Sequence, residues 1–146
     1  MATNQASDGA STSASTGACS DPVGPAVVHN SRAEVEAAYV GRWILCGEKL
    51  RAHPAHIGIE FKTDHRWILL NRNSAGVLVA TVGAENEGGY EVLDATSYNG
   101  PHMFQTNLTF DYNNGWLGGF NVFSSSPTGL RIVTDGGMPR YVATDE

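Results

Sequence analysis

The sequence predicts an all-β protein: an up-and-down antiparallel β-barrel of about eight or nine strands with a short N-terminal helix. From residue 41 to the C-terminus, short segments alternate apolar and polar residues. Turns rich in Gly, Asn, Asp and Ser separate these segments at regular intervals. Strands joined by short turns pair antiparallel, and a long meander removes its exposed edges by closing. These observations together favour a small barrel.

The composition is that of one ordinary globular domain. The chain has 146 residues, of which 41% are hydrophobic, so it is long enough to bury a core. The formal net charge is −6 and Lys plus Arg number only 9, which disfavours nucleic acid and anionic membrane surfaces as partners. No apolar run reaches the roughly 18 residues of a membrane-spanning helix, so no transmembrane segment is expected. No cofactor motif is recognisable, and no cofactor is expected.

The first 30 residues differ sharply from the rest. Residues 1–30 are rich in Ser, Thr, Ala and Gly, and they are expected to form a disordered tail and linker because they have little apolar surface to bury. Residues 31–146 are expected to form the barrel domain. The tail resembles the spacer that follows the lipidated cysteine of bacterial envelope lipoproteins. That resemblance implies a secreted, periplasmic or cell-envelope location, whereas an ordinary disordered tail would imply none.

The helix precedes the first strand. Ser31 and Glu34 fit a capping box, in which each side chain satisfies a free amide at the helix start. The helix is expected to run through Tyr39 and to end at Gly41. Val35 and Tyr39, together with Ala38, fall on one face at helical spacing.

The later segments alternate with a period of two, as half-buried strands do. The expected strands are 41–50, 57–62, 67–71, 77–82, 90–95, 103–112, 116–123, 130–133 and 140–143. Residues 87–89 are expected to form a turn, and Asn113-Asn114-Gly115 a hairpin turn suited to positive φ. Phe104, Leu108, Phe110 and Tyr112 are expected on one face of their strand.

Tyr39-Val40-Gly41-Arg42-Trp43 resembles the opening of the lipocalins and the wider calycin group. Proteins of that group begin with a short helical turn and a Gly-x-Trp on the first strand of an eight-stranded barrel. The resemblance implies structural roles for Gly41 and Trp43, with Trp43 closing the barrel floor under an arginine near the last strand. Arg140 is the expected arginine, with Arg131 as the alternative. The Thr-Asp-Tyr motif of that group is absent, since the chain has Thr63-Asp64-His65.

Period-two alternation also predicts which side chains face the barrel interior. If the interior holds a cavity, apolar and aromatic side chains line it and bind a small apolar molecule. The residues expected to do so are Ile59, Phe61, Trp67, Tyr90, Val92, Phe104, Leu108, Trp116 and Phe120.

The two cysteines, Cys19 and Cys46, form no metal-binding or CxxC motif. They are either unrelated thiols or a disulfide that pins the N-terminal segment to the first strand, and we expect the disulfide. The bond would imply an oxidising compartment.

Catalytic and metal-binding signals are weak. His53 and His56 are separated by a proline, so solvated loop histidines are expected and no metal site is predicted. Glu60 and Glu91 are expected to face solvent, and Asp94 is the least implausible general acid. No catalytic residue is predicted, so the sequence favours a non-enzyme without deciding the question.

Three functions follow. The first is binding of a small apolar ligand in a barrel interior. The second is an enzyme of isomerase or cyclase type that uses the same kind of barrel to shape its substrate. The third is a filled barrel that acts through its surface. The volume of the interior and the side chains that line it distinguish the three.

Overall fold

The computed structural model describes residues 29–46, 56–94, 104–126, 129–134 and 140–146. Side chains are described in 29–46, 56–94, 104–115 and 141–146. The predicted tail up to residue 28 therefore lies outside the described residues, as does the expected continuation of the first strand from 47 to 50. No described helix is long and apolar enough to cross a membrane.

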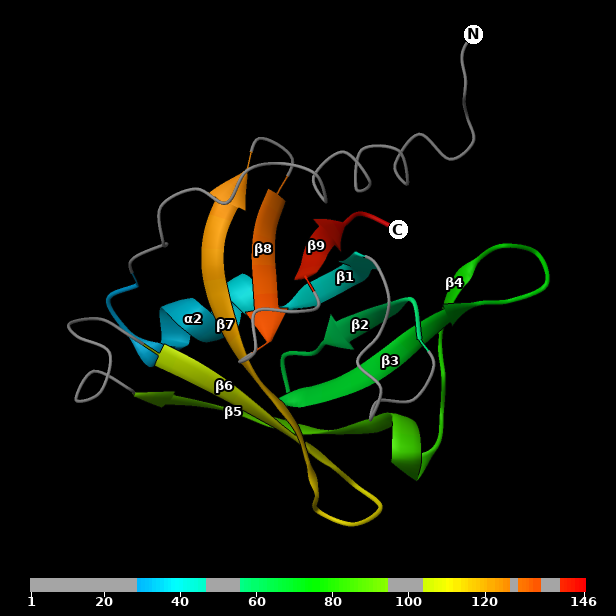
Figure 1. The fold of residues 1–146 in the computed structure, drawn as a ribbon, viewed down its shortest axis with the longest axis horizontal. Coiled ribbons are helices and arrows are strands. Elements are labelled where there is room, and N and C mark those ends of the chain that lie inside the picture. Colours follow the sequence, from blue (N-terminus) through cyan, green and yellow to red (C-terminus); the bar gives the residue numbers. More distant parts are fainter. Residues whose placement is uncertain (1–28, 47–55, 95–103, 127–128, 135–139) are drawn as a thin grey trace, which may run out of the picture.

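The described chain is one antiparallel sheet that curls into a half-barrel, with one short α-helix (Figure 1). The all-β prediction is confirmed at this level. The described elements are α2 (Arg32–Tyr39), β1 (Gly41–Cys46), β2 (Gly58–Phe61), β3 (Arg66–Arg72), β4 (Leu78–Ala80), the 3₁₀ turn η1 (Ala84–Asn86), β5 (Glu87–Asp94), β6 (Phe104–Phe110), β7 (Trp116–Ser126), β8 (Gly129–Thr134) and β9 (Arg140–Thr144).

Strands that are consecutive in the chain are neighbours in most of the sheet. The strand order is β2-β1-β9-β8-β7-β6-β5-β3-β4, and β2 pairs with β3 as well. β3 uses one long edge for two partners, because residues 66–68 pair with β5 and residues 70–72 pair with β4. The β3–β4 hairpin consequently projects from the rest of the sheet (Figure 1).

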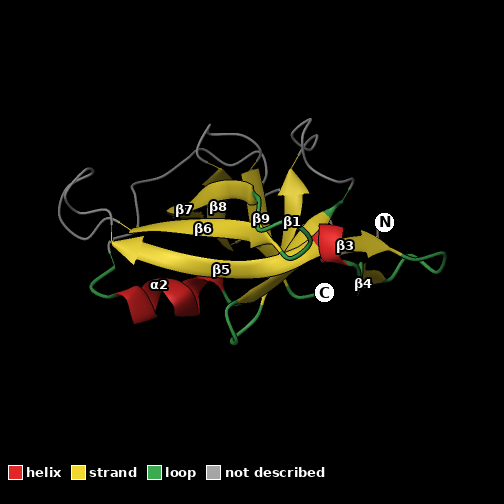
Figure 2. Ribbon diagram, turned by 90° about the horizontal axis from the view of Figure 1, so that it is seen from below, coloured by secondary structure: helices red, strands yellow, loops and turns green. Residues whose placement is uncertain are grey.

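Helix α2 begins close to where the sequence predicts. The Ser31 hydroxyl accepts a hydrogen bond from the Glu34 amide at 3.1 Å, which is half of the expected capping box. The Glu34 carboxylate accepts from the amide of Asn30 at 3.1 Å, one residue before the expected partner. Gly41 follows the helix with a φ of +130°, a conformation that favours glycine. The helix lies beside the C-terminal end of β5 (Figure 2).

Two strand predictions are wrong. Residues 87–89 were expected to turn, but they begin β5, and the turn lies one step earlier at Gly83–Asn86. Two consecutive glycines usually indicate a turn, but Gly88 is glycine here because β6 approaches it closely. The strand was expected to run to Tyr112, but β6 ends at Phe110. The Tyr112 side chain is exposed, although its ring still contacts that of Phe110 at a centroid distance of 5.4 Å. The hairpin turn after β6 is confirmed, with Asn114 at a φ of +56°.

β3 is buried on both faces. Trp67 and Leu69 belong to the main hydrophobic cluster, and the alternating residues Ile68 and Leu70 are buried as well. At the end of β3, Arg72 forms a bidentate ion pair with the Glu146 carboxylate, with N–O distances of 2.6 and 3.0 Å. This pair ties the last residue of the chain to β3.

Candidate functional site

The inward face of the curled sheet carries most of the side chains that the sequence assigns to a ligand site. Six of the nine predicted residues are buried together in one hydrophobic cluster, and Phe104 packs against it while partly exposed. The six are Ile59, Phe61, Trp67, Tyr90, Val92 and Leu108. Backbone register explains the convergence, because Phe61 pairs with Trp67 and Tyr90 pairs with Leu108. Period-two alternation thus identified the inward face correctly, while the ligand-binding role stays a prediction.

The remaining two predicted residues are placed by backbone register alone. Phe120 pairs with Thr106, and Trp116 pairs with Thr109. The register shifts between Leu108 and Thr109, so the alternation of β7 does not carry through to Trp116. The side chains of Trp116 and Phe120 lie outside the described ones.

Helix α2 closes one end of this inward face. Its buried side chains are Val35 and Tyr39, and the Tyr39 ring packs against Phe61 with a centroid distance of 5.1 Å. The indole Nε1 of Trp43 donates a hydrogen bond to the Tyr39 carbonyl at 2.8 Å. Burial raises the pKa of the Tyr39 phenol far above its usual range, so the phenol stays protonated.

Trp43 is buried, with 2% of its surface exposed. Its neighbour on β9 is Ala143, whereas Arg140 pairs with Cys46 at the other end of β1. The Arg140 side chain lies outside the described ones, so its stacking on Trp43 stays a prediction.

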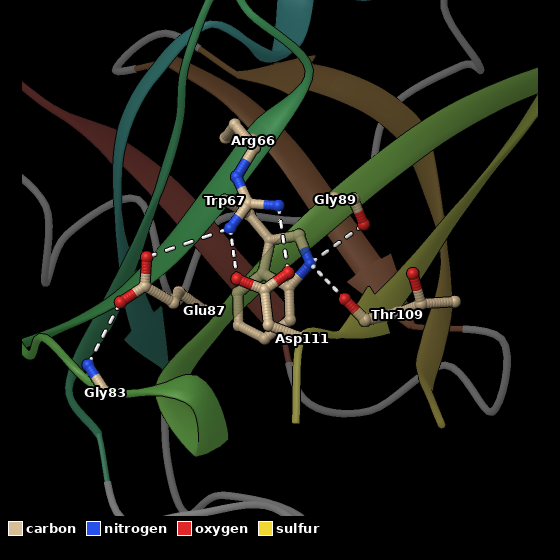
Figure 3. Close-up of polar contacts among 7 residues, drawn as sticks. All are labelled: Arg66, Trp67, Gly83, Glu87, Gly89, Thr109 and Asp111. Atoms are coloured by element: carbon tan, nitrogen blue, oxygen red, sulfur yellow. Dashed lines mark hydrogen bonds and ion pairs between the residues drawn. The ribbon is translucent and has the colours of Figure 1, made fainter. Parts of the chain in front are cut away.

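Trp67 joins three strands from inside the sheet. Its Nε1 atom lies 3.0 Å from the Gly89 carbonyl and 3.1 Å from the Thr109 carbonyl, so one donor serves both (Figure 3). Gly88 sits opposite Trp67 in the register. A Cβ at Gly88 would lie 1.7 Å from the Thr109 carbonyl oxygen, so only glycine fits between the tryptophan ring and β6.

An ion network lies at the surface next to this tryptophan. The Arg66 guanidinium donates hydrogen bonds to both carboxylate oxygens of Asp111 (Figure 3). It also lies 3.8 Å from the Oε1 atom of Glu87. The Oε2 atom of Glu87 accepts a hydrogen bond from the Gly83 amide. The hydrogen bonds from Arg66 lower the pKa of Asp111. Because these groups are solvated, the network fixes the turn after β6 rather than contributing much stability.

A second polar feature lies at the opposite end from α2. His56 Nε2 and the Tyr141 hydroxyl are 2.7 Å apart, and the rings stack with centroids 6.0 Å apart. His56 was expected to be solvated, but only 6% of it is exposed, so that prediction is wrong. The histidine lies two residues before β2 and is therefore carried into the packed part of the molecule. Burial raises the pKa of Tyr141 above its usual range.

A third polar feature is Thr106 on β6. It is fully buried, and among the described residues its Oγ1 atom has no hydrogen-bond partner of acceptable geometry. It lies two residues before Leu108 on the same strand and pairs with Val92 on β5, so it belongs to the inward face.

Little in the described chain resembles a catalytic or metal centre. No group of three or more His, Cys, Asp or Glu that could hold a metal occurs among the described residues. Asp94 ends β5 and is exposed, so it lacks the apolar surroundings that a general acid requires. Glu91 faces solvent as expected, and Glu60 is half-buried beside Arg42 at 3.3 Å.

Cys46 has no free thiol in the structure. Its predicted partner, Cys19, lies outside the described residues, so the pairing of the two stays a prediction.

Sequence reasoning left several inward residues out of the predicted site. Phe110 was expected on the same face as Phe104 and Leu108, and Leu69 follows Trp67 by two residues, so the pattern was sufficient to include both. Thr106 lies between Phe104 and Leu108 at the same spacing, so the pattern also places it inward, whereas His56 lies before β2 and carries no such signal.

Comparison with protein-family models, with curated proteins and with solved structures finds no match to this chain. The site and the fold therefore define a class only: a small, mostly β protein whose curled antiparallel sheet encloses an aromatic-rich inward face. The resemblance to lipocalins finds no support in these comparisons.

Proposed function

We propose that the chain is a binding module for a small, mostly apolar molecule, held against the inward face of its sheet. The observation that carries the proposal is the convergence of apolar and aromatic side chains from β2, β3, β5 and β6 on one face. Such faces bind ligands by apolar burial, at roughly 25 cal/mol per Å².

The ends of the inward face suit a ligand better than its middle. Ile59, Leu69 and Leu108 have no exposed surface, so no water-sized space adjoins them. Leu45 near one end and Phe104 near the other are only partly buried. A ligand therefore binds at an end, where a side chain has room to move aside.

We further propose that the sheet is a closed barrel with the lipocalin-like order of elements. Support comes from the additional pairing of β2 with β3, because it links strands at opposite ends of the sheet order. A Cys19–Cys46 disulfide and a secreted or envelope location are part of the same proposal. The absence of a free thiol at Cys46 is in keeping with such a bond.

A filled barrel acting through its surface is the second candidate. The zero exposure of the central inward residues favours it, because well-packed interiors leave no room for a ligand. The two candidates differ in one measurable property, which is uptake of a small molecule by the folded protein.

The test is binding of the neutral dye N-phenyl-1-naphthylamine to the full-length protein. We expect saturable dye fluorescence that naphthalene displaces. The Phe104→Glu variant should lose dye binding because it buries a carboxylate at the site. Glu91→Gln is the matched control, since Glu91 is exposed and lies on the same β5–β6 pair. Folded wild-type protein that takes up no dye would refute ligand binding and favour the filled barrel.

A further inference from the structure

Thr106 is the polar side chain that the packing of the inward face does not explain. It is fully buried, and no described residue satisfies its Oγ1 atom. Buried polar groups in native proteins almost always have a partner, because leaving a hydroxyl unpaired away from water costs free energy. A hydroxyl in this position has hydrogen-bonding capacity that it can offer to a further group.

Among the described side chains, the neighbours of Thr106 that the structure identifies are Val92, its partner on β5, and one second hydroxyl. On its other side, Thr106 pairs through the backbone with Phe120 of β7. The Tyr39 phenol of α2 interacts with the threonine hydroxyl without completing its hydrogen bonding. Two hydroxyl groups, of Tyr39 and Thr106, therefore meet beside the hydrophobic cluster to which Tyr39 and Val92 belong.

Phe104 controls access to this point. It precedes Thr106 by two residues on β6, so both belong to the same face. Phe104 is partly exposed, whereas Thr106 adjoins no water-sized space. Phe104 is therefore the described residue whose movement we expect to open a path to the threonine.

We infer that Thr106 anchors the polar group of a neutral ligand, namely an apolar ring or chain that carries one hydroxyl or carbonyl. This inference rests on the proposed function. A carboxylate is disfavoured because the described part of the chain buries no lysine or arginine that could compensate its charge, its buried polar side chains being His56 and Thr106.

Three ligands with one ring system test the inference by calorimetry: naphthalene, 2-naphthol and 2-naphthoate. Wild-type protein should bind 2-naphthol more tightly than naphthalene, and 2-naphthoate most weakly. Thr106→Val keeps the shape but removes the hydroxyl, so it should weaken 2-naphthol binding by about three- to tenfold and leave naphthalene unchanged. Thr106→Ser should retain the 2-naphthol preference. Phe104→Ala should strengthen binding of both neutral ligands.

The outcomes separate this inference from the proposed function. Equal loss of naphthalene and 2-naphthol in Thr106→Val, or 2-naphthoate as the tightest ligand of the wild type, would overturn the role of Thr106. Dye binding without binding of any of the three ligands would overturn it too, while the proposed function stands. If the folded wild type binds no dye, both the role of Thr106 and the proposed ligand-binding function are refuted. Melting temperature serves as the folding control for every variant.

Discussion

His56 Nε2 lies 2.7 Å from the hydroxyl of Tyr141, so one buried hydrogen bond joins residues that are 85 positions apart. The bond connects His56, two residues before β2, with Tyr141 on β9, and these two strands lie on either side of β1. Burying either polar group without a partner would cost free energy, and here each serves as a hydrogen-bond partner for the other, at the end of the sheet farther from α2.

The first prediction concerns this pair. Tyr141→Phe removes the phenol and leaves His56 without that partner, so the free energy of unfolding should fall by about 1–3 kcal/mol. Chemical denaturation of wild type and variant at neutral pH measures the difference. As a control, Tyr112→Phe removes an exposed phenol and should change stability little. Equal stability of Tyr141→Phe and wild type would show that the hydrogen bond is not a net contributor.

The second prediction is loss of stability at alkaline pH. Burial raises the pKa of Tyr90 to about 12, and it raises those of Tyr39 and Tyr141 further. Above pH 10, the unfolded chain releases these protons while the folded chain retains them, so folding becomes progressively less favourable as the pH rises. Below the ordinary tyrosine pKa near 10 the effect should vanish.

The measurement is the denaturant midpoint as a function of pH between 8 and about 11.5, with phenolate absorbance followed in parallel. Tyr141→Phe should show a shallower decline than the wild type. A midpoint that stays constant through this range would contradict the assignment of buried, protonated tyrosines.

The third prediction compares two adjacent glycines of β5. A Cβ at Gly88 would lie 1.7 Å from a backbone oxygen of Thr109, whereas a Cβ at Gly89 would meet nothing closer than 3.6 Å. Gly88→Ala should therefore destabilise the protein by about 3 kcal/mol or more, because β5 and β6 must separate. Gly89→Ala should cost less than about 1 kcal/mol. Thermal melts of the two variants measure both losses of stability. A larger loss for Gly89→Ala than for Gly88→Ala would refute the register of these strands.

The fourth prediction concerns Trp43. The ring is buried and its indole is hydrogen-bonded to Tyr39, so Trp43→Ala should cost about 3–5 kcal/mol. If Arg140 stacks on the ring as the family resemblance implies, Arg140→Ala should cost roughly 0.5–2 kcal/mol. A double-mutant cycle measures the coupling between the two. Zero coupling would remove the predicted stacking and leave Trp43 as a core residue only.

The fifth prediction is the disulfide between Cys19 and Cys46. A cross-link of this kind should stabilise the protein by roughly 3–4 kcal/mol in the chain-entropy model. Alkylation of the unfolded protein without reductant should label neither cysteine, and the Cys19→Ser variant should expose one reactive thiol at Cys46. Two labelled thiols in protein isolated from an oxidising compartment would end the idea.

The sequence by itself determined the local structure. Ser31 and Glu34 located the start of α2, alternation located the strands, and Asn114 located a hairpin turn. The same alternation assigned six of the nine predicted inward residues to the buried face, because the side-chain period of a strand is a purely local property.

Only the tertiary structure decided the outcomes that depend on distant contacts. The glycine pair after residue 87 looks like a turn, yet it is strand because β6 and Trp67 press against Gly88. His56 looks solvated, yet Tyr141 holds it in a buried position. Thr106 shares the face of Phe104 and Leu108 by local alternation, but only the packing of α2 brings the Tyr39 phenol to its hydroxyl. Burial of a polar group is set by what lies across the sheet, and that partner is separated from it by many residues in the chain.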